Sequence, residues 1–393
     1  MAVIPLSEPR RKPIVPPRGF ALFALGFRPF YLLAATLAVL FVPVWIVLLA
    51  GGLSLPGGIS PLVWHGHEMI FGFACAVIVG FLLTAAKNWT GLETPRGWPL
   101  AALAGLWLAG RIALLSLPPV PAALIDLAFL PLAALAVGRV LVRAGSRRNY
   151  FVLLILVLLT LANALSHAGS QGWLQLSPLL GLHLAIALIA TLCTVIAGRI
   201  VPSFTANALK ISFWRHAQVD QLAIASTLTS LMLWAFEAPG MWLSPVALLA
   251  ALSQVVRCWG WRPGRTFGVP LLWILHVSHA WLIVALLLLA AGQQQAAVHL
   301  LTVGLIAGLI LGMITRTALG HTGRLLKAGW IESLCYLLLQ LALLARVLPA
   351  LLWPAAYMPG LHLSATAWAL CFVLYLWKYA PMLWHPRVDG QEG

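Results

Sequence analysis

Two histidines and a glutamate stand close together in the stretch WHGHEMIFGF, at positions 64–73. His65, His67 and Glu68 open a long apolar run, and polar side chains at the mouth of a membrane helix are costly and usually mark a site. Imidazole binds haem iron, copper and zinc. Because the two histidines are two residues apart, a helix sends them to nearly opposite sides. They can serve one metal only if His65 still lies in the entering loop, and otherwise they serve two centres.

The role of Glu68 is open between three alternatives. A carboxyl group beside a metal can donate a proton to a reducible substrate, fix the tautomer of an imidazole, or bind the metal itself. We expect Glu68 to be a proton donor or an imidazole partner before a ligand.

The composition places most of the chain in a membrane. The 393 residues are 62% hydrophobic and 8% charged, with a mean hydropathy of +0.98, whereas about a quarter of a soluble domain is charged. The sequence therefore predicts an all-α, polytopic membrane protein in contact with the lipid bilayer. The net charge of +15 must be interpreted through the loops, and no nucleic-acid motif accompanies it.

Charge alternation along the chain predicts its topology. Apolar windows of about twenty residues, enough to cross a hydrocarbon core of about 30 Å, can be placed at 29–51, 65–86, 98–116, 121–142, 149–170, 178–200, 219–237, 241–258, 269–291, 296–316, 328–347 and 361–384. All lysines and arginines except Arg111 and Arg346 then fall on one side, which the positive-inside rule makes the cytoplasm. We predict one transmembrane domain of twelve helices at 29–384, with cytoplasmic segments at 1–28 and 385–393.

Histidines gather at one depth of this bundle. Six of the eleven fall in the outer leaflet, namely His65, His67, His167, His183, His299 and His362. His276 and His279, three residues apart and so on one helix face, lie nearer the middle. A single intramembrane histidine is commonly a polar group bonded across helices. A layer of six favours haem or metal binding instead, with His65, His67, His183 and His299 as the preferred ligands and His167, His276, His279 and His362 as further cofactor-binding candidates.

Glycines form a ladder on the helix that carries His299. Gly304, Gly308 and Gly312 repeat every fourth residue. This spacing is typical of close helix packing. The alternative is a flat wall against which a porphyrin could lie.

Two arginines depart from the cytoplasmic rule. Arg111 lies at a depth similar to that of Asp126, which predicts an ion pair between them. The alternative is that Arg111, or Arg346 near the outer end of its helix, binds haem propionates, whose charge needs compensation near lipid.

Four stretches together resemble the NnrS family of bacterial inner-membrane proteins. They are WHGHEMIFGF (64–73), GFLLTAAKNWTG (80–91), GRIVPSFTANAL (198–209) and HLLTVGLIAGLILGMITRTALGHTGR (299–324). The resemblance implies a protein that contains haem, of the b type, and copper, and that is associated with denitrification and nitric oxide stress. His65, His67 and His299 match the motif histidines. His321 matches too, but its expected cytoplasmic position argues against a role as a ligand.

Two classes of function compete. The first is a membrane oxidoreductase that binds nitric oxide in the outer half of the bundle and reduces it toward nitrous oxide, with electrons from quinol or a periplasmic donor and protons delivered through Glu68. The second is a non-catalytic haem or copper protein that binds, senses or exports nitric oxide, haem or copper. The number of outer histidines, enough for more than one centre, favours the enzyme. A secondary transporter is disfavoured by the missing internal repeat and the scarcity of membrane carboxylates.

Overall fold

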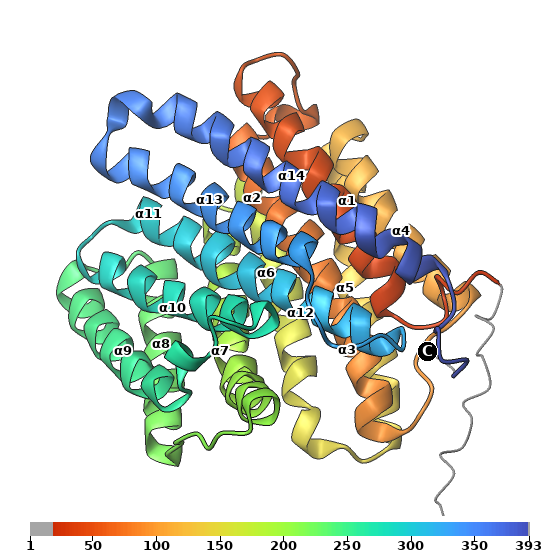
Figure 1. Cartoon of the computed structure of the whole chain (residues 1–393). Coiled ribbons are helices and arrows are strands. Elements are labelled where there is room, and N and C mark those ends of the chain that lie inside the picture. Colours follow the sequence, from red (N-terminus) through yellow and green to blue (C-terminus); the bar gives the residue numbers. More distant parts are fainter. Residues whose placement is uncertain (1–18, 392–393) are drawn as a thin grey trace, which may run out of the picture.

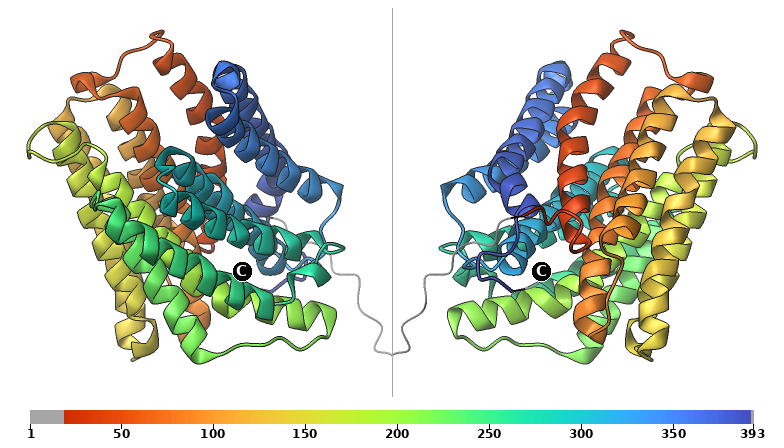
Figure 2. Two further views of the ribbon diagram at one scale, coloured as in Figure 1. Left: turned by 90° about the vertical axis from the view of Figure 1, so that its left-hand side faces the viewer. Right: turned by 90° about the vertical axis from the view of Figure 1, so that its right-hand side faces the viewer.

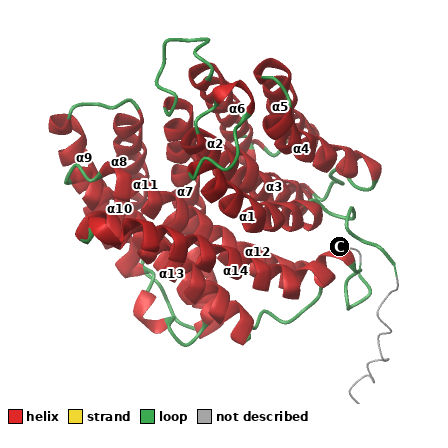
Figure 3. Cartoon of the chain, turned by 90° about the horizontal axis from the view of Figure 1, so that it is seen from above, coloured by secondary structure: helices red, strands yellow, loops and turns green. Residues whose placement is uncertain are grey.

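The computed structural model describes residues 19–391, and this part of the chain consists of helices and their connections (Figure 3). The helices are α1 (Phe27–Leu49), α2 (Pro61–His67), α3 (Cys75–Thr90), α4 (Trp98–Ser116), α5 (Pro119–Arg143), α6 (Phe151–Ser170), α7 (Leu180–Leu209), α8 (Ala217–Ala235), α9 (Gly240–Gly260), α10 (Pro270–Ala290), α11 (Gln294–His299), α12 (Gly308–His321), α13 (Trp330–Leu352) and α14 (Tyr357–Trp384) (Figure 1). Short 3₁₀ turns lie at Pro56–Gly58, Arg147–Asn149, Pro263–Arg265 and Pro354–Ala356. The expected all-α architecture is confirmed. Residues 1–18 of the expected cytoplasmic N-terminal segment and the last two residues of the expected tail lie outside the described residues.

Two π-helical segments interrupt the α-helical geometry without ending the helices. Glu68–Ala74 joins α2 to α3, and Leu300–Ala307 joins α11 to α12. Two continuous rods result, Pro61–Thr90 and Gln294–His321. Each π segment begins directly after a histidine, His67 in one rod and His299 in the other. Wide turns of this kind occur often at functional sites.

The helices follow from the apolar runs and the residues that interrupt them. A backbone buried in hydrocarbon must satisfy its hydrogen bonds within its own segment, which favours helices. Pro119 and Pro270 occupy the first positions of α5 and α10, where the missing N–H has no intrahelical partner to lose. Gly91 ends α3 in the left-handed conformation, at φ 68°, and its N–H is bonded to the carbonyl of Lys87.

Eleven of the described helical stretches are long and apolar enough to cross a membrane, and they coincide with eleven of the expected windows. The chain is therefore a polytopic membrane protein. The window at 219–237 is also helical, as α8, but it is less apolar than the others. Its buried face carries Asp220, Thr227 and Ser230.

Most helix boundaries differ by a few residues from those expected, and two of these differences affect the histidines. The first rod begins at Pro61 rather than at residue 65, so His65 and His67 both lie on helix. α7 continues to Leu209 instead of ending near residue 200. The last turns are less apolar than the rest of the helix, and a polar contact between Thr205 Oγ1 and His276 Nε2, 2.9 Å apart, connects them to α10.

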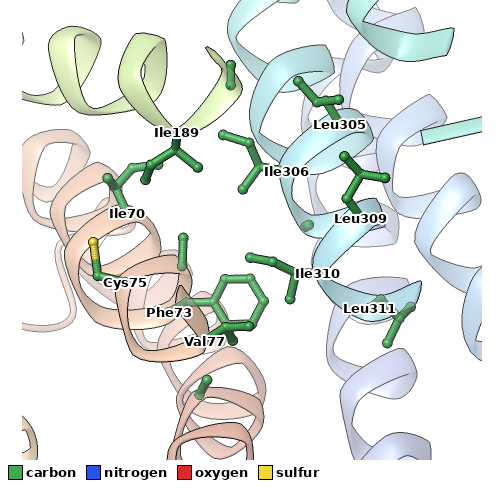
Figure 4. Close-up of a cluster of buried hydrophobic side chains, with 14 of the residues drawn as sticks. Ile70, Phe73, Cys75, Val77, Ile189, Leu305, Ile306, Leu309, Ile310 and Leu311 are labelled. Atoms are coloured by element: carbon green, nitrogen blue, oxygen red, sulfur yellow. The ribbon is translucent and has the colours of Figure 1, made fainter. Parts of the chain in front are cut away.

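Neighbouring helices in the chain pack as antiparallel pairs, and α14 returns to lie along α1, so that the last and first long helices are side by side (Figures 1 and 2). The two rods are the most enclosed elements. The buried share of their apolar windows is 83% for Pro61–Thr90 and 72% for Gln294–His321, against 33–61% for the other spans. Figure 4 shows the two rods facing one another, with Phe73 and Val77 opposite Ile306 and Ile310. Any site between the rods is therefore at the centre of the bundle.

Candidate functional site

A cavity of about 570 Å³ lies between the two rods, near the first turns of α7 and α11 and beside the connection between α8 and α9. Its volume is typical of cofactor and small-molecule sites, which measure about 300–1,000 Å³. Ile70, Phe73 and Ile306 belong to its largely apolar lining and meet the buried core shown in Figure 4. Among the imidazole, carboxyl and guanidinium groups of the described residues, those that line it are His65, His183, Glu237, His299 and Arg346.

Three imidazoles reach this cavity from three different helices, α2, α7 and α11. The Nδ1 atoms of His65 and His183 are buried and have no hydrogen-bond partner among the described residues. The Nδ1–H of His299 donates to the carbonyl oxygen of Gln295, at 3.0 Å. This bond fixes the tautomer of His299 and leaves its Nε2 with a free lone pair, as in an imidazole that binds a metal.

Tryptophans hold two of these rings in place. The His65 ring stacks on Trp45, with centroids 4.1 Å apart and planes inclined by 21°. The His183 ring lies 4.4 Å from the ring of Trp234. The contacts restrict the rotation of the two rings, so the imidazoles keep a defined orientation at the edge of the cavity.

A cation and an acid complete the polar lining. The Arg346 guanidinium lies over the Tyr357 ring, 5.1 Å from its centroid, and no carboxylate pairs with it among the described residues. Glu237 follows α8 with a positive φ of 53°, and it belongs to the lining. Both side chains are therefore available to a ligand.

A second polar cluster lies outside the cavity and joins α2, α5 and α6. His67 Nε2 is 3.2 Å from Asp126 Oδ2, and His167 Nε2 is 2.9 Å from the same oxygen. Asn163 donates its amide N–H to Asp126 Oδ2 at 2.8 Å, and its amide oxygen is 2.9 Å from His67 Nε2. His67, Asp126 and His167 offer three ligand atoms within 4.8 Å of one another, which makes the group a candidate metal-binding site.

Arg111 connects the carboxylates of this cluster. Its Nη1 donates to both carboxylate oxygens of Glu68, each at 3.0 Å, and its Nη2 donates to Asp126 Oδ1. The exposed fractions are 0% for Glu68 and 3% for both Arg111 and Asp126. The ion pair expected between Arg111 and Asp126 is therefore present, and Arg111 does not line the cavity in which a propionate would lie.

Two glycines allow the helices to approach closely around this ion pair. A Cβ added at Gly72 would lie 2.9 Å from Glu68 Oε2 and 3.1 Å from Arg111 Nη1, and one added at Gly110 would lie 3.3 Å from the Cα of Asp126. The carbonyl of Gly72 accepts the indole N–H of Trp107 at 3.1 Å. The two glycines thus leave room for a charged network between closely packed membrane helices.

His65 and His67 serve different places, as their spacing on a helix requires. His65 faces the cavity and His67 the cluster. Glu68 lies 3.4 Å from His67 Nδ1 and does not line the cavity. The structure thus separates the outer histidines into two groups, His65 with His183 and His299, and His67 with His167.

The remaining candidates lie apart from both groups. His276 contacts Thr205, and His279 Nε2 is 3.1 Å from Gln254 Oε1, so both take part in bonds between helices. His362 is exposed on α14 and does not line the cavity. Its depth matches that of the other outer histidines, but its position around the helix axis turns it away.

The glycine ladder packs against α10 rather than against the cavity. Added Cβ atoms would lie 2.7 Å from Trp281 Cβ at Gly304 and 2.2 Å from Ser278 Oγ at Gly308. Neither glycine lines the cavity. The ladder therefore serves close helix packing, and the porphyrin-wall alternative is not supported.

Some residues that support the two groups of histidines belong to no motif that the sequence analysis singled out. Asn163 is an ordinary polar residue of an apolar span until it meets Asp126, and Trp45 and Trp234 are two among eighteen tryptophans. A search for polar residues at matching depth on adjacent spans would have identified Asn163, four residues before His167 on the same helix face.

The comparisons with known proteins agree with the sequence motifs. None of the curated proteins compared with the chain matches it. The sequence profile of the NnrS protein family matches residues 21–387, and the chain therefore belongs to this family.

Proposed function

We propose that the protein is a membrane haem oxidoreductase that binds nitric oxide in the cavity between the rods and reduces it to nitrous oxide. The observation that supports this function best is the convergence of three imidazoles on one apolar cavity, from His65, His183 and His299. The function would give resistance to nitrosative stress.

The residues of the cavity fit a haem. Its lining is mainly apolar, as the porphyrin faces require, and the imidazoles of His65, His183 and His299 could hold the iron. Arg346 could pair with the propionates, the role considered for it and for Arg111. Bound in the cavity, haem b would supply a redox-active iron that binds nitric oxide. One or two of these three histidines would hold the iron.

Side chains of the protein would supply the protons of the reaction, and the membrane would give nitric oxide access to the cavity. Reduction of two nitric oxide molecules to nitrous oxide and water consumes two protons and two electrons. Glu237 is the carboxyl group of the lining, whereas Glu68, proposed as a catalytic residue, could act only through His67 and Arg111. Nitric oxide is small and apolar, so it could enter from the bilayer. Electrons would come from quinol or from a periplasmic donor.

The orientation of the chain in the membrane is part of the same proposal. Twelve membrane crossings, with α8 as the seventh, put both termini in the cytoplasm of a bacterial inner membrane and the cavity in the periplasmic half. The alternation of basic residues supports this topology, because only Arg111 and Arg346 depart from it.

The first test is a reduced-minus-oxidised spectrum of the purified protein, with haem quantified as the pyridine haemochrome and nitric oxide consumption measured with an electron donor. We expect haem in the wild type and at least a tenfold loss of haem in His299→Ala, with His216→Ala as the matched control in a cytoplasmic connection. Wild-type protein that binds no haem would refute the proposal. A haem that binds nitric oxide without consuming it would instead favour the non-catalytic alternative, a protein that binds, senses or exports nitric oxide, haem or copper.

The contribution of Glu68 is tested by Glu68→Gln. If Glu68 supplies protons through the cluster, the variant keeps the haem spectrum and slows nitric oxide turnover about tenfold or more, within the range ascribed to general acid–base groups. Unchanged turnover would remove Glu68 from the mechanism and leave it as the structural partner of Arg111.

A further inference from the structure

Two buried histidines of α10 belong to neither of the two groups described above. His276 and His279 are three residues apart on one helix face, and they are 7% and 0% exposed. We propose that they form a proton relay from the membrane face at which α10 begins, the cytoplasmic face in the proposed orientation, to the near end of the cavity. The relay rests on the proposed function, because it supplies the protons that nitric oxide reduction consumes.

The first argument is that the hydrogen bonds of His276 determine its tautomer. The hydroxyl of Thr205 donates to the carbonyl oxygen of Val201, at 2.9 Å. Because this uses the hydroxyl hydrogen, the 2.9 Å contact between Thr205 Oγ1 and His276 Nε2 requires the hydrogen on Nε2. The neutral ring of His276 therefore has its lone pair on Nδ1, where a proton can bind.

The tautomer of His279 is determined in the same way. The amide nitrogen of Gln254 donates to the carbonyl oxygen of Ala223 at 3.3 Å and to Thr227 Oγ1 at 3.0 Å. The amide oxygen of Gln254 is then the acceptor in its 3.1 Å contact with His279 Nε2, so the hydrogen lies on this nitrogen. The second imidazole also presents its lone pair at Nδ1.

The second argument concerns buried polar atoms without a partner. His279 Nδ1, Ser278 Oγ and Ser230 Oγ have no hydrogen-bond partner among the described residues, and all three side chains are 0% exposed. A buried helical serine can donate to the carbonyl four residues earlier, as Ser226 does to Leu222. A buried polar group without a partner costs about 1–3 kcal/mol, and ordered water is its usual partner. Imidazoles, hydroxyls and waters in series are the components of a proton path.

The two unpartnered hydroxyls lie close to the cavity, although neither lines it. Ser278 packs against the second rod, where a Cβ added at Gly308 would lie 2.2 Å from its Oγ, and the preceding residue, Ala307, lines the cavity. Ser230 precedes Trp234, another lining residue, by one turn of α8, about 6 Å along the helix. A path through His279 therefore ends about one turn from the cavity.

The other end of the path lies near the start of α10. His276 follows Pro270, the first residue of the helix, by six positions, which is about 9 Å along the axis. His276 and His279 both lie against the Trp261 ring, with centroids 6.4 Å and 4.9 Å from it. Side chains three residues apart on a helix are about 5–6 Å apart at Cβ, so one water can connect the two rings.

The charged side chain nearest to this path is compensated. The Arg257 guanidinium lies over the same Trp261 ring, 5.3 Å from its centroid. Its Nε donates to Asp220 Oδ1 at 2.7 Å. The carboxylate balances the guanidinium, which reduces its repulsion of a proton on His279.

The proton balance of the relay is simple. A proton from water binds Nδ1 of His276, passes to Nδ1 of His279, and leaves toward the hydroxyls of Ser278 and Ser230. Each imidazole returns to its neutral form, and both Nε2–H groups keep their bonds to Thr205 and Gln254. Two passages supply the two protons consumed with every two nitric oxide molecules.

The experiment measures the side of the membrane from which protons are taken. Protein with a C-terminal affinity tag is reconstituted into liposomes, and vesicles in which the tag is protected from added protease, so that both termini face the lumen, are selected. A pH-sensitive dye reports the lumen, and nitric oxide and a membrane-impermeant electron donor are added outside. The variants are His279→Ala and Ser278→Ala. The matched controls are His362→Ala, at an exposed histidine of α14, and Ser226→Ala, at a buried serine whose hydroxyl has a partner.

We expect the wild type and both controls to take one proton from the lumen for each nitric oxide consumed. His279→Ala should lower turnover and luminal proton uptake at least tenfold, as for the loss of a general acid–base group, with its haem content unchanged. Added imidazole should restore turnover at least threefold, which a purely structural role of His279 would not allow. Ser278→Ala, a smaller change that tests the relay even if His279→Ala does not fold, should lower turnover at least threefold.

Three results would overturn the relay and leave the proposed function intact. They are proton uptake from the outer medium with an unchanged lumen, wild-type turnover in Ser278→Ala or folded His279→Ala, and a loss in His279→Ala that imidazole does not reverse. A wild type that binds haem and consumes no nitric oxide would overturn the reductase and the relay together. The two proposals can therefore be told apart when one of them fails.

Discussion

The variant Arg111→Gln tests the buried ion network directly. Arg111 is 3% exposed and makes three hydrogen bonds to two carboxylates, those of Glu68 and Asp126. Removing one partner of a buried ion pair costs about 3–5 kcal/mol, because the other charge is left uncompensated. Since Arg111 compensates two carboxylates, we expect the upper end of this range, about 5 kcal/mol, which is comparable to the whole stability of many domains.

The assay is equilibrium unfolding by SDS in mixed micelles, followed by tryptophan fluorescence. Arg143→Gln, at an exposed arginine near the end of α5, is the matched control and should stay within about 0.5 kcal/mol of the wild type. The double variant Arg111→Gln/Asp126→Asn should recover part of the loss, because one uncompensated charge is then neutral. A free energy of unfolding within about 1 kcal/mol of the wild type for Arg111→Gln would refute the reasoning, because the carboxylates would then not depend on this guanidinium.

Two further predictions concern other parts of the molecule. Gly308→Ala places a methyl group 2.2 Å from Ser278 Oγ, so it should lower the free energy of unfolding by about 1–3 kcal/mol. The control Gly264→Ala, whose methyl group has nothing within 4 Å, should lower it far less. Equal effects of the two substitutions would contradict the packing role of the ladder. In the C-terminal tail, a hydrogen bond from Arg387 lowers the pKa of Asp389 to about 2. A lowered pKa in the folded state stabilises the docked tail above the unfolded pKa, and this contribution is lost as the pH falls through the folded value, here between about pH 4 and 2. Hydrogen exchange of the tail should accelerate in this window relative to Asp389→Asn at the same pH, and identical rates in the two proteins would disprove the linkage.

The helical membrane architecture could be predicted because its signals are local. An apolar run of twenty residues forms a helix in lipid whatever its neighbours are. The exception shows the limit of this argument, since α8 is helical but carries Asp220, Thr227 and Ser230 on its buried face and is less apolar than the other long helices.

The site could be predicted in part. The spacing of His65 and His67 requires opposite directions on a helix, and the structure sends one to the cavity and the other to the cluster. The pair between Arg111 and Asp126 followed from their similar depth on adjacent spans. His362 had the same depth as the other outer histidines, yet it is exposed.

The sequence by itself determined the position of each polar residue along its helix and so its expected depth, because a helix rises about 1.5 Å per residue from a boundary that hydropathy and loop charge predict. Only the tertiary structure decided which residues of equal depth meet, because this depends on the rotation of each helix against its neighbours. That rotation is set by packing at close contacts such as Gly72 and Gly110, where a single added carbon would crowd the Glu68 and Arg111 side chains or the backbone of Asp126. His167 and His183 have the same expected depth, but the packing of their helices directs His167 toward Asp126 and His183 toward the cavity.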